Sequence, residues 1–92
     1  MTSEISVERE PSLSKLNVMG VFDWAILDKD TGTFNWKYDR KETCYILEGS
    51  FSVTPQAGKT QHFKKGDLIS FSEGLECIWI VTKPVKKHYH LW

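Results

Sequence analysis

The sequence predicts an all-β protein that folds as one small domain, and two observations support this prediction. Short runs rich in β-branched and aromatic residues recur along the chain, and polarity within them alternates with a period of two, as it does in strands. Turn-forming groups such as DKDTG, EGS, PQAGK, KKGD and TKPVK separate these runs at roughly even spacing. Such a pattern is typical of a sandwich or barrel, and 92 residues enclose only one compact core.

The elements can be placed in order along the chain. Residues 1–15 are polar and contain Pro11, so we expect a mobile N-terminal arm there and the folded domain over residues 16–92. No stretch of useful length shows the helical period. The predicted strands cover residues 18–26, 33–38, 43–48, 51–54, 61–63, 68–71, 77–81 and 87–92.

Strand alternation assigns the side chains to two faces. Cys77, Trp79 and Val81 are expected inside the barrel, which leaves Ile78 and Ile80 on its outer surface. An exposed apolar patch of this kind marks interaction surfaces, so we expect the chain to form a homodimer. On the earlier strands the same alternation groups Trp36 with Tyr38, and Glu42 with Cys44 and Ile46.

Composition excludes several classes of partner. Twelve basic and twelve acidic residues cancel, which argues against a nucleic-acid or membrane-surface binder. No apolar run reaches membrane-spanning length, and the Glu-rich start has no apolar leader. The cysteines, Cys44 and Cys77, lack CxxC spacing and are expected to be reduced. We therefore expect a soluble cytoplasmic protein.

Two motifs resemble those of the cupin family. The pattern WxYxxxExxxxxxG, from Trp36 to Gly49, has the spacing of the first cupin motif, and GDLISFSEGLEC, from Gly66 to Cys77, has that of the second. With the terminal KHY, the chain resembles, over residues 20–89, the small one-domain cupins related to the ureidoglycine aminohydrolase cupin domain. The resemblance implies a single-domain jelly-roll β-barrel, and dimerisation is frequent among such proteins.

The resemblance also implies where a metal would bind. Metal-dependent cupins take two His and one Glu from the first motif and a His from the second, at the positions of Trp36, Tyr38, Glu42 and Cys77. Only Glu42 is retained. An indole has no in-plane lone pair, and a tyrosine binds metal well only after losing its proton. We therefore expect no full metal triad, no metal site and no other cofactor.

The same positions predict a different kind of site. Walls of Trp36, Tyr38 and Trp79, with Glu42 and Cys77 as polar groups, have the makeup of a small-molecule pocket, and the rings could stack a planar amide or ureide. Two plainer interpretations stay open: the aromatics fill the barrel, and Glu42 sits at the rim paired with Arg40 or Lys41. For Cys77, packing is favoured over a nucleophilic role.

Other polar residues carry weaker signals. His88 and His90 have a spacing that can chelate metal, although terminal strand histidines are more often exposed. The pairs Lys64–Lys65 and Lys86–Lys87 are interpreted as solvated faces.

Three functions follow as alternatives. The first is binding of a small polar or ureide-like molecule, by Trp36, Tyr38, Glu42, Cys77 and Trp79. The second is a metal-poor hydrolase or lyase in which Glu42 is the acid/base and Tyr38 a hydrogen-bond donor. The third is a structural or partner-binding barrel. Because the cupin fold hosts many activities, the sequence leaves open whether the protein is an enzyme.

Overall fold

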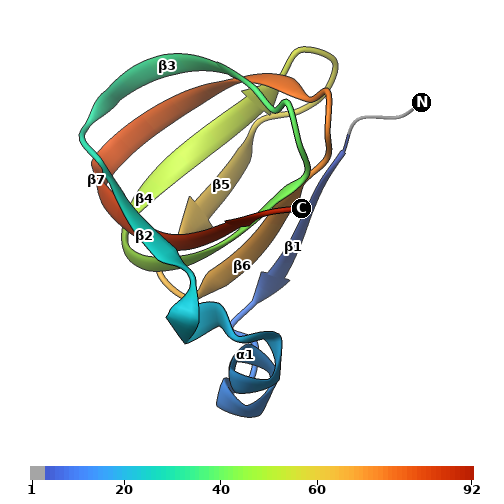
Figure 1. Ribbon diagram of the computed structural model, residues 1–92. Helices are drawn as coiled ribbons and strands as arrows, with labels where there is room; N and C mark the ends of the chain where they lie inside the picture. Colours follow the sequence, from blue (N-terminus) through green and yellow to red (C-terminus); the bar gives the residue numbers. More distant parts are fainter. Residues whose placement is uncertain (1–3) are drawn as a thin grey trace.

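Seven antiparallel strands curl into a barrel in the computed structural model, which describes residues 4–92 (Figure 1). The strands pair in the order β1-β6-β4-β7-β2, with β3 paired to β7 and β5 to β4. Their bounds are β1 Ile5–Arg9, β2 Ala25–Lys29, β3 Gly32–Lys37, β4 Glu42–Pro55, β5 Gln61–Lys64, β6 Asp67–Phe71 and β7 Glu76–Leu91. The all-β prediction is confirmed.

Strands β4 and β7 are each longer than the sequence predicts. Two segments expected to be turns continue these strands instead, through β-bulges. The register between them shifts three times between Ile46 and Phe51. Gly49 has φ 95° there, and a Cβ on it would clash with the carbonyl oxygen of Pro84. Glycine and proline are both tolerated at bulges. The groups EGS and TKPVK therefore bend two continuous strands instead of ending them.

The N-terminal residues belong to the fold, so the expectation of a mobile arm is wrong for most of residues 1–15. Strand β1 pairs with β6 from Ile5 opposite Phe71 to Arg9 opposite Asp67. The alternate side chains Ile5 and Val7 pack against the barrel core. This apolar contact fixes the segment to the sheet. Residues 1–3 of the predicted arm lie outside the described residues.

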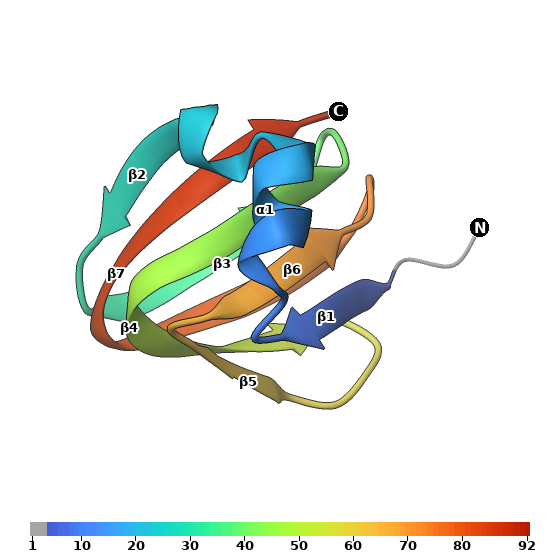
Figure 2. The same cartoon turned by 90° about the horizontal axis from the view of Figure 1, so that it is seen from below.

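A short helix, α1 (Leu13–Met19), and a 3₁₀ turn, Val21–Asp23, occupy much of the predicted strand 18–26. The Ser12 hydroxyl accepts a hydrogen bond from the Lys15 N–H, and Gly20, with φ 75°, ends the helix. Seven residues are too few for a helical period to show in the sequence. The helix lies outside the barrel (Figures 1 and 2), where Leu16 and Val21 pack with Leu68 of β6.

The barrel interior holds the main core, and the predicted faces of β7 are confirmed. Cys77, Trp79 and Val81 are buried, whereas Ile78 and Ile80 are 41% and 40% exposed. The buried core residues are Tyr38, Cys44, Ile46, Phe51, Val53, Phe63, Ile69, Phe71, Leu75, Cys77, Trp79, Val81 and Val85. Within residues 4–92, no helix has the length and apolar character needed to cross a bilayer.

Candidate functional site

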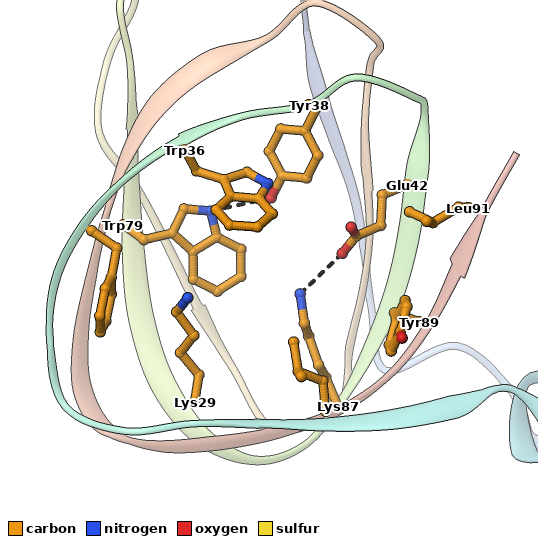
Figure 3. A pocket seen from close by; sticks show the side chains of 10 residues that line it. Lys29, Trp36, Tyr38, Glu42, Trp79, Lys87, Tyr89 and Leu91 are labelled. Carbon is orange, nitrogen blue, oxygen red and sulfur yellow. Dashed lines mark hydrogen bonds and ion pairs between the residues drawn. The ribbon is translucent and has the colours of Figure 1, made fainter.

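A cavity of about 240 Å³ opens in one part of the barrel interior, between β2, β3, β4 and β7 (Figure 3). Four of the five predicted ligand-binding residues line it: Trp36, Tyr38, Glu42 and Trp79. The fifth, Cys77, does not. The remaining lining residues are Leu27, Lys29, Phe34, Lys87, Tyr89 and Leu91. The sequence therefore located the cavity but missed both of its lysines.

Strand register explains how these side chains meet. Residues opposite each other in an antiparallel pair point to the same face. Leu27 of β2 lies opposite Lys87 of β7, and Phe34 of β3 lies opposite Trp79. Glu42, the first residue of β4, lies opposite Leu91 near the end of β7. Sheet pairing alone thus places acidic, basic and aromatic groups around one space.

The polar centre of the cavity is an ion pair between Glu42 and Lys87. The Lys87 ammonium donates a hydrogen bond to Glu42 Oε2 at 3.0 Å, and each side chain is less than a tenth exposed. The same ammonium lies 4.7 Å from the centre of the Trp79 ring, a cation–π contact. Glu42 is therefore neither a rim residue nor paired with Arg40 or Lys41. The interpretation of Lys87 as a solvated lysine is wrong.

Tyr38 is held as a neutral phenol. Its hydroxyl accepts a hydrogen bond from Trp79 Nε1 at 3.1 Å, and its ring stacks on Phe71 at 4.7 Å between centres. Burial, and then the negative charge of Glu42, raise the pKa of Tyr38 above its usual value of 10.0. At neutral pH this side chain is a hydrogen-bonding group and not a base.

Lys29 lies nearer the mouth, beside two aromatic rings. Its Nζ is 4.2 Å from the centre of the Phe34 ring and 5.2 Å from that of Trp36. Trp36 itself is 46% exposed and meets Tyr38 edge to face. The cavity therefore has a half-exposed aromatic rim at Trp36 and, at its floor, the buried Glu42–Lys87 pair. Leu27 and Leu91, which lie opposite this pair in the sheet, are each 43% exposed.

Both thiols are buried and free in the described chain. Burial raises the pKa of Cys44 to about 12 and that of Cys77 to about 11. Cys77 borders a separate surface hollow with Asn35, Gln56 and Glu76. A thiol that stays protonated at neutral pH is a weak nucleophile, in agreement with the packing interpretation.

The residues at the four metal-ligand positions of cupins do not fit a metal ion. The indole of Trp36 offers no lone pair, the Tyr38 oxygen already accepts from Trp79, and the carboxylate of Glu42 faces an ammonium. Cys77 lies outside the cavity. Within residues 4–92, no group of three His, Cys, Asp or Glu side chains gathers closely enough to hold one.

His88 and His90 project away from the cavity, on the outer face of β7. His88 is buried, with Nδ1 at 3.0 Å from the Trp24 carbonyl oxygen. His90 stacks on the Trp24 ring and meets Trp92 edge to face. Both histidines join β7 to the segment before β2, so the expectation of exposed terminal histidines is wrong for His88.

Comparison with known proteins places the chain in a family. Residues 16–89 match the EutQ-like cupin domain, so the chain belongs to the EutQ-like cupin domain family. The match and the structure together confirm the jelly-roll cupin barrel. No curated protein matches the chain.

Solved structures agree with this assignment. A DUF861 family protein from Thermotoga maritima is 46% identical, with a TM-score of 0.93, over 97% of this chain and 100% of its own. A putative ethanolamine utilization protein Q from Salmonella typhimurium is 25% identical, with a TM-score of 0.65, over 73% of this chain and 54% of its own. The EutQ protein of Clostridium difficile, at 15% identity and TM-score 0.63, over 96% of this chain and 67% of its own, shares the fold.

Proposed function

We propose that this cupin binds a small polar molecule with a planar amide or ureide-like group in the barrel cavity, without a metal ion. The observation that carries the proposal is the Glu42–Lys87 ion pair, which borders empty volume between aromatic walls. A buried ion pair is a weak source of stability, and a packed apolar pair often replaces it at no cost. Its presence beside a cavity is better explained by a ligand.

The chemistry of the pair suits an amide. The carboxylate of Glu42 accepts hydrogen bonds, the ammonium of Lys87 donates them, and an amide or ureide offers both partners in one plane. Trp36 and Trp79 supply flat apolar walls. The volume, about 240 Å³, is below the roughly 300–1,000 Å³ of sites for drug-sized ligands, so the ligand has few atoms. The ureide part of the proposal also draws on the motif resemblance to the ureidoglycine aminohydrolase cupin domain.

Tryptophan fluorescence tests the proposal, because Trp36 and Trp79 line the cavity. Titration with methylurea or acetamide should change the emission in a saturable way. Glu42→Gln and Lys87→Met should abolish this change. Glu48→Gln and Lys83→Met, on exposed positions of the same two strands, should keep it. A saturable response that survives both cavity variants would show that binding occurs elsewhere.

A second candidate function is a metal-poor hydrolase or lyase with Glu42 as the acid/base. The favouring observation is that Glu42 has a proton donor, Lys87, at 3.0 Å in a site with little water access. The neutral Tyr38 would then orient a substrate through a hydrogen bond. Turnover of amide or ureide substrates by wild type, lost in Glu42→Gln with the fold intact, would support this candidate. Binding without turnover would reject it.

The third alternative, a structural or partner-binding barrel, is less well supported at the cavity, because a solid interior would leave no lined space there. Self-association is a separate proposal. Ile78 and Ile80 lie on the outer face of the barrel, opposite Asn35 and Thr33 of β3, and this uncharged surface suits a homodimer interface.

A cytoplasmic location is also proposed, and the free thiols agree with it.

A further inference from the structure

The charges that line the cavity do not balance. Glu42 and Lys87 offset each other, but Lys29 forms no ion pair with any residue in the described part of the chain. The buried phenol of Tyr38 stays neutral. The cavity therefore carries one surplus positive charge, although the whole chain has none.

The two ammonium groups belong to one face of the β2–β7 pair. Leu27 lies opposite Lys87, and Lys29 is two residues further along β2, so Lys29 and Lys87 are diagonal neighbours. Backbone positions related in this way are about 7–8 Å apart, within reach of long side chains. In Figure 3 both lysines extend from the β2 and β7 side of the cavity toward the aromatic rings and Glu42. Glu42 neutralises Lys87, but no ion pair in the described part of the chain neutralises Lys29.

The contacts of Lys29 hold its ammonium without neutralising it. The faces of Phe34 and Trp36, at 4.2 and 5.2 Å from Nζ, attract a cation but carry no net charge. A lysine so placed keeps its hydrogen-bond donors and its charge for a further partner. Because Lys29 is half-buried whereas Glu42 and Lys87 are buried, we assign that partner to the more exposed end of the ligand.

We propose that the cavity selects small molecules that carry a carboxylate at one end and an amide or similar polar group at the other. This inference rests on the proposed function, and adds Lys29 as the residue that determines specificity. The carboxylate would pair with Lys29 at the rim, the amide would meet Glu42 and Lys87 at the floor, and a short carbon chain would lie between Trp36 and Trp79. The small volume excludes long chains and large rings.

Two probes of nearly equal shape test the inference. Succinamate and succinamide both carry a terminal amide, but only succinamate has a carboxylate at the other end. In wild type, succinamate should bind about tenfold more tightly, as expected for one hydrogen bond to a charged group in a partly buried site. Fluorescence titration of both compounds gives the ratio directly.

The ratio of the two affinities, compared between wild type and variants, also tests whether Lys29 causes the preference for the carboxylate. Lys29→Met should reduce it to about one by weakening succinamate alone, while Lys29→Arg should keep most of it. Lys37→Met, an exposed lysine of β3 that does not line the cavity, is the matched control and should leave the ratio unchanged. Equal affinities in wild type, or an unchanged ratio in Lys29→Met, would overturn the inference.

Methylurea separates this inference from the proposed function. If methylurea binds in the cavity and succinamate does not, the carboxylate inference is wrong and the proposed function stands. If none of the three compounds binds at millimolar concentration, both are wrong.

Discussion

Two parts of the barrel interior differ in how they are filled, although β4 and β7 line both. One part is packed: Phe51 stacks on Trp79 at 4.2 Å between ring centres, and Phe63 contacts both Phe51 and Phe71. The other part is hollow, and Glu42 and Lys87 face each other there. Trp79 lies between them, with Phe51 on its ring and the Lys87 ammonium 4.7 Å from its centre.

This difference shows that side chains on one face of a single strand can line both a packed core and a cavity, because the residue type changes along the strand while the facing stays the same. Trp79 and Val81 of β7 supply the packed part, and Lys87 and Tyr89, pointing to the same side, supply the hollow part. Packed apolar residues gain stability from contact and burial, whereas a buried ion pair beside a cavity contributes little. The following substitutions test this division.

The largest loss of stability is expected at Trp79, which lies between the packed and the hollow part of the barrel. Trp79→Ala should lower the free energy of unfolding by about 3 to 5 kcal/mol, because a large buried aromatic is deleted. Trp36→Ala, which removes the half-exposed wall of the same cavity, should cost less than about 1 kcal/mol. Urea denaturation measures both. A loss below about 1 kcal/mol for Trp79→Ala would place that ring outside the packed core.

Breaking the ion pair should have the next largest effect. Lys87→Met leaves Glu42 buried without a partner and should cost about 3 kcal/mol. Adding Glu42→Leu should restore most of this loss, because the stranded charge is then gone. Lys83→Met, on an exposed position of β7, is the control. A cost for Lys87→Met no greater than that of the control would mean that water screens the pair.

A smaller effect should appear in alkaline solution. Burial raises the pKa of Cys44 from 9.0 to about 12, so the unfolded chain loses this proton at a lower pH than the folded chain. The stability that the neutral thiol contributes is complete below pH 9 and is lost as pH rises toward 12. By pH 10 the loss should reach about 1 kcal/mol for this thiol. Thermal unfolding of wild type and Cys44→Ala between pH 8 and 10 should show a steeper decline in wild type; parallel curves would contradict this.

The smallest effect on folding is expected outside the barrel. Ile78→Lys with Ile80→Lys should change the stability of the isolated chain by no more than about 0.5 kcal/mol per site, because both side chains are well exposed. The same double variant should abolish self-association measured by light scattering. A wild type that stays monomeric at high micromolar concentration would reject the dimer, and two dimeric proteins would place the interface elsewhere.

The packed part of the barrel was largely predictable from the sequence. Period-two runs identified an all-β fold, and alternation placed Trp79 inside and Ile78 outside, because the sheet period is fixed by backbone geometry. The first cupin motif located Trp36, Tyr38 and Glu42, which do line one cavity. Residue spacing within one strand is enough for such predictions.

The lysines of the hollow part were missed for a different reason. Lys87 follows the phase of Cys77, Trp79 and Val81. The group TKPVK, however, has the composition of a turn, and this conceals the continuity of β7 in the sequence. Lys29 lies at the end of β2, beyond the predicted strand. Bulges and strand ends depend on contacts across the sheet, here Gly49 against Pro84, and sequence alone does not display them.

The long ladder between β4 and β7 also leads us to expect an order in which the barrel closes. Pro55 pairs with Cys77, but Glu42 pairs with Leu91, across more than half of the chain. Contacts between residues so distant in sequence raise the contact order and slow folding, and doubling the loop costs about 0.6 kcal/mol of closure entropy. We therefore expect the end of the ladder that holds Glu42 to pair with β7 last. A molecule bound against the Glu42–Lys87 pair would stabilise that end of the barrel.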